Sequence, residues 1–269
     1  MTVRLGAVGY LNARPLVYGL EQDARFQVRY DLPSECARLL HAHEIDLGLI
    51  PSIEYLRGSS PYGIVYGAAV TSKGPVKSVA LYTRRDPRDI RTVAMDTSSR
   101  TSVALVTILL KRMHGLTIEP VAMAPDLNVM LERADAALII GDVALFLDHA
   151  AAGVHKIDLG EAWTGATGLP FVYALWAGWP DAVSPADIAA LRAARDSGVE
   201  HVDAIAAVHA PGDPARQAMI GRYLRDNIRY RLGAQEEEGL RTFYRYATEL
   251  SLASFDGELR IYHGDDRAD

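Results

Sequence analysis

The stretch KSVALYT, residues 77–83, decides how the chain is divided, because a second run of similar length and character, PFVYALWAG, follows at residues 170–178. Both runs are apolar and bounded by proline, glycine or charged residues, so both are predicted to be extended. The stretch between them carries its own alternation of strand and helix patterns. Two extended segments that enclose a separate α/β stretch predict two crossings between two lobes.

Short apolar runs alternate with helix-like segments ahead of the first crossing. Between the second and third runs, LPSECARLLHAHEID reads as a helix for which Ser34 is a suitable N-cap. Strands separated by helices indicate parallel pairing with helical crossovers, and therefore an α/β fold. The strands expected here are residues 3–8, 27–31, 46–51 and 62–70.

The enclosed stretch and the tail complete the predicted architecture. A strand at residues 92–95 is followed by the hydroxyl-rich TSSRTS and a helix that is apolar nearly all round, so that this helix should be buried. Beyond residue 179 only helix-like segments follow; the first is marked by Ser184 and Pro185, and the tail is expected to pack against one lobe. We expect the first lobe to hold residues 1–83 and 173–269, with the C-terminal helices, and the second lobe to hold residues 84–172.

Composition narrows the class of protein. The 269 residues are 49% hydrophobic, contain no apolar run of membrane-spanning length, and begin with no recognisable secretion signal. The single cysteine, Cys36, rules out an internal disulfide, so we expect a cytoplasmic protein that engages no membrane. A net charge of -6 disfavours nucleic-acid binding, and no phosphate-binding glycine motif or metal-ligand set is evident, so neither a cofactor nor a metal is expected.

The stretch GAVGYLNARPL, residues 6–16, holds the first candidate site residues. If residues 3–8 form a parallel strand, Tyr10 and Asn12 follow its carboxyl end, where α/β proteins bind ligands. Tyr10 offers a ring face and a hydroxyl, and Asn12 an amide that both donates and accepts. Asn12 either contacts a ligand or caps the next helix.

A second candidate is the start of the helix after TSSRTS. Hydroxyl side chains and free backbone N–H groups at a helix start suit a carboxylate or a phosphate, because the helix dipole favours the same charge there. The alternative is a well-capped helix that uses one hydroxyl. The candidate residues are Thr97, Ser98, Ser99 and Thr101.

Weaker candidates lie at other strand ends and turns. Ser78, early in a crossing segment, either faces the cleft or satisfies a neighbouring backbone group, and Ser34 and Ser52 each follow a proline after a strand. Asp142 follows a strand and precedes a helix, where it either caps or acts on a ligand. No strand end offers a nucleophile with its base or a histidine base, so the sequence indicates mild catalysis or binding alone.

Six motifs in unbroken order, from residue 3 to residue 178, resemble those of the menaquinone-biosynthesis chorismate dehydratases of the futalosine pathway, relatives of the type II periplasmic binding proteins. They are GYLNARPL, IPSIEYL, VKSVALYT, DTSSRTSVAL, ALIIGDVAL and TGLPFVYALWAG. The resemblance implies a two-lobe Venus-flytrap enzyme that dehydrates chorismate, a small dianion, to 3-[(1-carboxyvinyl)oxy]benzoate. A transient contact with the next enzyme of the pathway is a further expectation.

The resemblance also implies roles for residues. Asn12 of GYLN and Ser78 of KSV are the leading active-site residues, and the hydroxyl-rich loop clamps a carboxylate from the other lobe. Two alternatives stay open. One is the related 1,4-dihydroxy-6-naphthoate synthase of the same pathway, and the other is a non-catalytic binding protein for small anions with the same fold.

Overall fold

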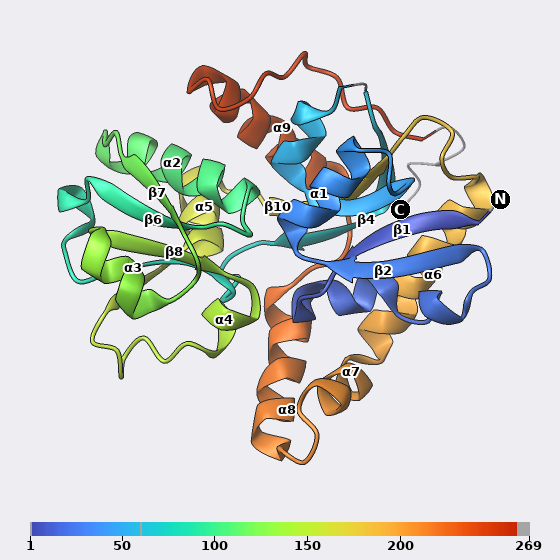
Figure 1. The fold of residues 1–269 in the computed structure, drawn as a ribbon, viewed down its shortest axis with the longest axis horizontal. Coiled ribbons are helices and arrows are strands. Elements are labelled where there is room, and N and C mark those ends of the chain that lie inside the picture. The colour runs from blue at the N-terminus through green and yellow to red at the C-terminus, as the bar shows by residue number, and fades with distance from the viewer. Residues whose placement is uncertain (1, 60, 263–269) are drawn as a thin grey trace.

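A computed structural model describes residues 2–59 and 61–262 of the chain. Within these residues the strands form two five-stranded sheets, and each sheet is the centre of one lobe. Figure 1 shows the lobes side by side, with both chain termini on the first lobe and the second lobe at the left. The expected α/β architecture of two lobes is confirmed.

The sheet of the first lobe has the order β2-β1-β3-β10-β4. β1 pairs in parallel with β2 and with β3, and the helix α1 (Pro33–His41) makes the crossover from β2 to β3. α1 begins at Pro33 with Leu32 as its N-cap, so the prediction that Ser34 caps this helix is wrong; proline lacks an N–H and fits the first helical turn. The strands are β1 (Val3–Val8), β2 (Phe26–Asp31), β3 (Leu47–Pro51), β4 (Gly63–Ser72) and β10 (Phe171–Gly178).

The sheet of the second lobe has the order β7-β6-β8-β5-β9, with β6 parallel to both of its neighbours. Its strands are β5 (Val79–Thr83), β6 (Thr92–Asp96), β7 (Glu119–Met123), β8 (Ala136–Ile140) and β9 (His155–Asp158). Its helices are α2 (Thr101–His114), α3 (Leu127–Arg133), α4 (Gly141–Phe146) and α5 (Leu159–Thr167). Most of α2 is buried, as its all-round apolar sequence predicts.

The chain crosses between the lobes twice. It leaves the first sheet after Ser72 and enters the second at Val79, then returns from α5 to enter the first sheet at Phe171. β5 and β10 are each antiparallel to both of their neighbours, because each enters its sheet from the opposite lobe. The divisions expected after residues 83 and 172 therefore differ from the sheet membership, which assigns residues 79–83 to the second lobe and all of β10 to the first.

The C-terminal segment is helical, as expected. It contains α6 (Pro185–Glu200), α7 (Val202–His209), α8 (Pro214–Arg222), a π-helical turn (Tyr223–Asn227) and α9 (Ala234–Glu249). Ser184 caps α6 through a capping box with Asp187.

This segment contacts both lobes, and the expectation that it packs against one lobe alone is wrong. α6 packs against the 3₁₀ helix η1 (Leu11–Val17) of the first lobe. Glu249 at the end of α9 forms an ion pair of 2.9 Å with Arg112 of α2 in the second lobe. The sequence does not specify this ion pair, because Arg112 and Glu249 are both exposed charged residues on separate helices.

None of the helices within residues 2–59 and 61–262 combines the length and the apolar character that crossing a bilayer requires.

Candidate active site

A cavity lies between the lobes, with walls from both. Its empty volume, which includes space that is open to solvent, is about 490 Å³. The first lobe contributes residues that follow β1 and residues of β3, β4 and β10; the second contributes the first turns of α2 and α4 and the ends of β5 and β8. Ligand sites of α/β proteins commonly lie at such a meeting of strand ends and helix starts.

Asn12 lines this cavity from η1, directly after β1. Tyr10, not Asn12, occupies the N-cap position of η1, and no side chain caps this helix. The alternative in which Asn12 is a helix cap is therefore wrong. Its half-buried amide, able to donate and accept hydrogen bonds, lies in the cavity wall.

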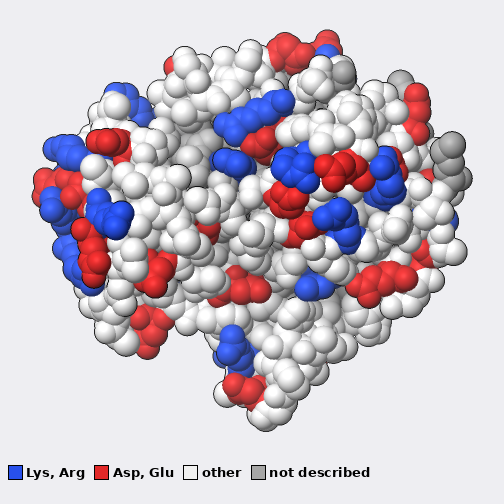
Figure 2. Space-filling model, in the orientation of Figure 1, with Lys and Arg blue, Asp and Glu red and all other residues white. Residues whose placement is uncertain are grey.

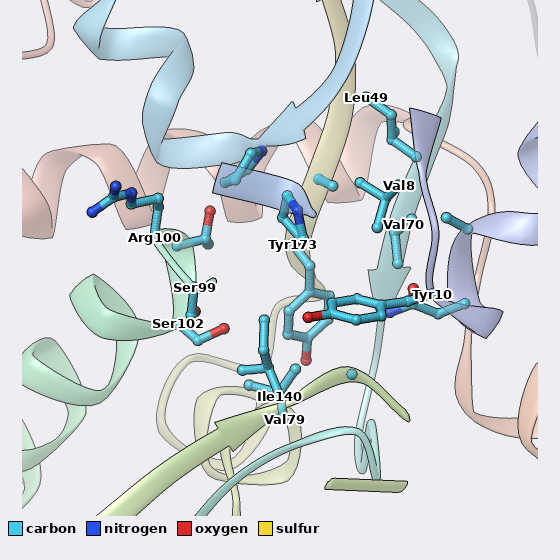
Figure 3. Close-up of a pocket in the computed structure, with 17 residues that line it drawn as sticks. Val8, Tyr10, Leu49, Val70, Val79, Ser99, Arg100, Ser102, Ile140 and Tyr173 are labelled. Atoms are coloured by element: carbon cyan, nitrogen blue, oxygen red, sulfur yellow. The ribbon is translucent and has the colours of Figure 1, made fainter. Parts of the chain in front are cut away.

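Tyr10 also lines the cavity and links the lobes. Its hydroxyl lies 3.0 Å from the hydroxyl of Ser98 in the second lobe. In Figure 3 the Tyr10 hydroxyl and the Ser102 hydroxyl point toward the same space from opposite sides. Burial raises the pKa of Tyr10, an effect that the contact with Ser98 partly offsets, so Tyr10 remains a protonated donor at neutral pH.

The start of α2 forms the opposite wall. Ser99, Arg100, Thr101 and Ser102 line the cavity, and no side chain caps the helix at its N-cap residue, Arg100. The first turn of this 14-residue helix therefore presents backbone N–H groups and the positive end of its dipole beside the cavity. Such a wall suits a carboxylate.

Arg100 is the one cationic side chain among the described residues that line the cavity. It is exposed and extends outward at the rim in Figure 3. At this position its charge attracts anions toward the mouth of the cavity.

The remaining walls are largely apolar. Val8, Leu49 and Val70 of the first lobe face Val79 and Ile140 of the second across the cavity (Figure 3). Apolar walls lower the local dielectric, so hydrogen bonds and charges inside act more strongly than they do in water.

Tyr173 of β10 also lines the cavity. Its hydroxyl lies 2.9 Å from that of Ser72, and burial raises its pKa well above the ordinary value. Tyr173 is therefore a neutral group in the wall. Its hydroxyl is held by Ser72, the last residue of β4 before the chain crosses to the second lobe.

Ser78 does not line the cavity; it lies one layer behind the wall. Its hydroxyl accepts a hydrogen bond of 2.7 Å from the Tyr223 hydroxyl, and its carbonyl oxygen accepts one of 2.8 Å from the N–H of Gly141, which does line the cavity. Of the two possibilities for Ser78, the structure places its side chain against protein groups rather than in the open cleft.

Asp142 joins the lobes without lining the cavity. Its carboxylate accepts a hydrogen bond of 3.1 Å from the N–H of Leu11, and Ile140 rather than Asp142 is the N-cap of α4. The alternative in which Asp142 caps its own helix is therefore wrong, because its side chain instead accepts from the N–H of Leu11 at a helix start in the other lobe. Burial raises the pKa of Asp142, and the Leu11 N–H partly offsets this.

Four further predicted site residues lie away from the cavity lining. Ser34 is half buried on α1, although its neighbour Pro33 lines the cavity, and Thr97 is exposed. Ser98 donates to Asp96 at 2.7 Å, while Ser52 donates to the carbonyl oxygen of Val172 at 2.7 Å. The hydroxyls of Ser98 and Ser52 are therefore hydrogen-bonded to protein groups.

Tyr10, Asn12, Ser99 and Thr101 are thus the predicted site residues that the structure brings to one cavity. Sequence reasoning missed Arg100 and Ser102, although both lie in the TSSRTS motif. It also missed Tyr173, whose place in a buried strand gives no local signal that its side chain lines a cavity.

Among the described residues, neither a concentration of one charge on the face in Figure 2 nor a cluster of metal-binding side chains marks a second candidate site. On the face in Figure 2, basic and acidic side chains are interspersed over both lobes. Among the residues that the structure describes, no group of three or more His, Cys, Asp and Glu side chains is placed to hold a metal ion.

Comparisons with known proteins connect this geometry with a family. Residues 3–249 match a family model described as menaquinone biosynthesis. The chorismate dehydratase of Thermus thermophilus is 32% identical over 256 residues, which cover 89% of this chain and 93% of that protein.

Solved structures extend the likeness at the level of the fold. A protein of Archaeoglobus fulgidus has a TM-score of 0.75 at 18% identity, with 93% of this chain and 98% of that chain covered. The alkanesulfonate-binding protein SsuA of Xanthomonas axonopodis pv. citri, bound to MOPS, has a TM-score of 0.69 at 16% identity, with 94% of each chain covered. The two lobes therefore have the periplasmic-binding-protein fold.

Proposed function

The chain belongs to the menaquinone-biosynthesis family, and we propose that it is an enzyme of this biosynthesis that converts chorismate to 3-[(1-carboxyvinyl)oxy]benzoate and water. One observation carries the proposal beyond family membership: the cavity between the lobes places the amide of Asn12 opposite the uncapped start of α2. A polar group that can steer a reaction and a wall that suits a carboxylate thus face the same enclosed space.

The proposed dehydration needs little chemical assistance from the protein. The ring hydroxyl leaves, together with the hydrogen on the carbon that bears the enolpyruvyl ether, and the ring becomes aromatic. Aromatisation supplies the driving force, so the enzyme needs only to orient the substrate, exclude water and assist the proton transfer. The largely apolar walls fit this requirement.

The lining residues offer no strong base. Among the described residues around the cavity there is no His, Asp, Glu or Lys. In the proposed mechanism the enolpyruvyl carboxylate of the substrate takes the proton, while the Asn12 amide holds that carboxylate or the departing hydroxyl. The substrate thereby supplies the base: its carboxyl passes the proton to the departing hydroxyl, which leaves as water, and the carboxylate is restored.

The start of α2 holds the second carboxylate in this proposal. Backbone N–H groups of its first turn, with the hydroxyls of Ser99 and Ser102, line the cavity as donors, while the Thr101 hydroxyl accepts a hydrogen bond of 3.2 Å from the N–H of Ile53. Arg100 at the rim contributes attraction for a dianion rather than a buried ion pair. Ser78 acts from behind the wall, through its contacts with Tyr223 and Gly141.

We also place the enzyme in the cytoplasm. Cys36, the single cysteine, is buried on α1 and burial raises the pKa of its thiol to about 12, so it is an unreactive packing residue that needs no oxidising compartment.

Incubation of the purified protein with chorismate tests the proposal. We expect the diene absorbance of chorismate to fall while a benzoate chromophore rises, and mass spectrometry to show a product lighter by one water. Tight binding of chorismate with no product would overturn the proposal in favour of a binding protein. No binding and no turnover would direct attention to the related 1,4-dihydroxy-6-naphthoate synthase reaction.

A further inference from the structure

Tyr223 is a fully buried tyrosine that lies between the two residues singled out by the family motifs. It begins the π-helical turn after α8, far from the cavity in sequence, and is only 2% exposed. Its hydroxyl donates a hydrogen bond of 2.7 Å to the Ser78 hydroxyl. The Asn12 side chain is a further neighbour of the same hydroxyl and acts to lower its pKa.

The single hydroxyl proton of Tyr223 determines which of its neighbours accepts a hydrogen bond and which can donate one. A tyrosine hydroxyl has one proton, and here it is donated to Ser78, so the oxygen of Tyr223 is left only to accept. Of the neighbouring Asn12 amide only the NH₂ can donate to this oxygen, so a contact between the two orients the amide nitrogen toward Tyr223. The amide oxygen and one N–H of Asn12 then remain for a ligand in the cavity.

Burial holds Tyr223 in the protonated form that this arrangement needs. Burial raises the pKa of Tyr223 well above its ordinary value, and the hydrogen bond with Ser78 offsets only part of this effect. A neutral tyrosine donates to Ser78 over the whole range of pH at which the protein would work.

The same turn also holds the backbone of the first crossing. Asn227, four residues after Tyr223, donates to the carbonyl oxygen of Pro75 at 2.8 Å. Within the crossing, Lys77 has φ +63° and the N–H of Ser78 bonds to the carbonyl oxygen of Val76 at 2.8 Å, a tight and strained three-residue turn. π-Helical turns are frequent at functional sites, and this one contacts the strained segment at two points.

From these contacts we infer that Tyr223 is a positioning residue that orients the Asn12 amide and the Ser78 hydroxyl for the dehydration. The inference rests on the proposed function, since it assigns Tyr223 a part in that reaction. Tyr223 does not itself line the cavity; it acts through Asn12, which does, and through Ser78.

The substitution Tyr223→Phe tests this inference, because it removes the hydroxyl and keeps the ring. The matched control is Tyr230→Phe: Tyr230 is also buried in the tail, and its hydroxyl has no hydrogen-bond partner among the described residues. We expect Tyr223→Phe to lower kcat about tenfold and to leave KM within about twofold, as for the loss of one orienting hydrogen bond. Tyr230→Phe should leave both constants unchanged.

A second measurement does not depend on turnover. The side-chain amide resonances of Asn12, identified by their loss in Asn12→Ala, should shift in the ¹⁵N–¹H spectrum of Tyr223→Phe and stay in place in Tyr230→Phe. Unshifted Asn12 resonances together with unchanged kcat would overturn the inference, as would a parallel loss of kcat in both variants. Failure of the wild-type protein to turn over chorismate would instead overturn the proposed function, and the amide resonances would still report whether Tyr223 orients Asn12.

Discussion

The carboxylate of Asp142 accepts a hydrogen bond of 3.1 Å from the N–H of Leu11. A residue in the first turn of α4 in the second lobe thus provides the acceptor for a backbone N–H at the start of η1 in the first lobe. Removal of this acceptor by Asp142→Ala leaves the Leu11 N–H without its partner when the lobes are closed. We expect KM for chorismate to rise about fivefold, the effect of roughly 1 kcal/mol on closure. Small-angle scattering should show a larger radius of gyration in Asp142→Ala, and unchanged scattering and kinetics would contradict the role of this contact.

The pH dependence of stability offers a separate check on Asp142. Burial raises its pKa in the folded protein above the ordinary value of an aspartate, so its protonated form is favoured by folding. The stability that comes with protonation is present below the unfolded pKa and is lost as pH rises through the folded pKa. Asp142→Asn, which keeps an acceptor oxygen without the charge, should therefore have a Tm at pH 7 equal to or above that of the wild type, with the difference shrinking in acid. A Tm that is lower at pH 7 would refute this sign.

Gly141 has φ +66°, and a Cβ placed on it would lie 2.8 Å from ring atoms of Tyr10 in the opposite lobe. Gly141→Ala should thus push Tyr10 away and open the cavity. Gly153 has a similar φ of +63° but open space around it, so Gly153→Ala reproduces the backbone strain alone. We expect each variant to lose about 1–2 kcal/mol of stability by denaturant unfolding. Only Gly141→Ala should lower kcat/KM, by about tenfold or more; equal activities would show that the Tyr10 contact is irrelevant.

Arg100 should act on substrate capture. Replacement by glutamine removes the positive charge at the rim, and we expect KM to rise about fivefold at low ionic strength with little change in kcat. The difference from the wild type should diminish as salt is added, because the side chain is exposed. Arg88→Gln, a change at another exposed arginine of the second lobe, is the control. A salt-independent effect, or the same effect in both variants, would argue against this role.

Asn12 carries the largest expected effect of any single side chain. Asn12→Ala should lower kcat about 100-fold or more, in the range found when one preorganised hydrogen-bonding group is removed from an active site. Asn128→Ala makes the same chemical change on the exposed face of α3 and should leave turnover intact. Full activity in Asn12→Ala would remove this residue from the mechanism.

Local signals explain which elements could be predicted from the sequence. β1 spans Val3–Val8 as expected, and Ser184 with Pro185 begins α6, because each depends on residues within a few positions. β7 and β9 were missed: they lie at the sheet edges, where their partly exposed residues form no apolar run.

The site could be predicted where it follows from strand ends. Tyr10, Asn12, Ser99 and Thr101 could be placed together at one cavity because parallel strands and the following helix starts gather at one edge. Tyr223 could not be found in this way, since its partner Ser78 lies 145 residues earlier in the chain. The contacts of Asp142 also depend on how two lobes meet, which no local pattern describes.

A crystal structure of the Asn12→Ala protein with chorismate bound tests the central claim most directly. We expect the ligand between the lobes, with one carboxylate against the first turn of α2 and the enolpyruvyl group beside position 12. Chorismate found elsewhere on the protein, or turned so that neither carboxylate meets the start of α2, would contradict the account.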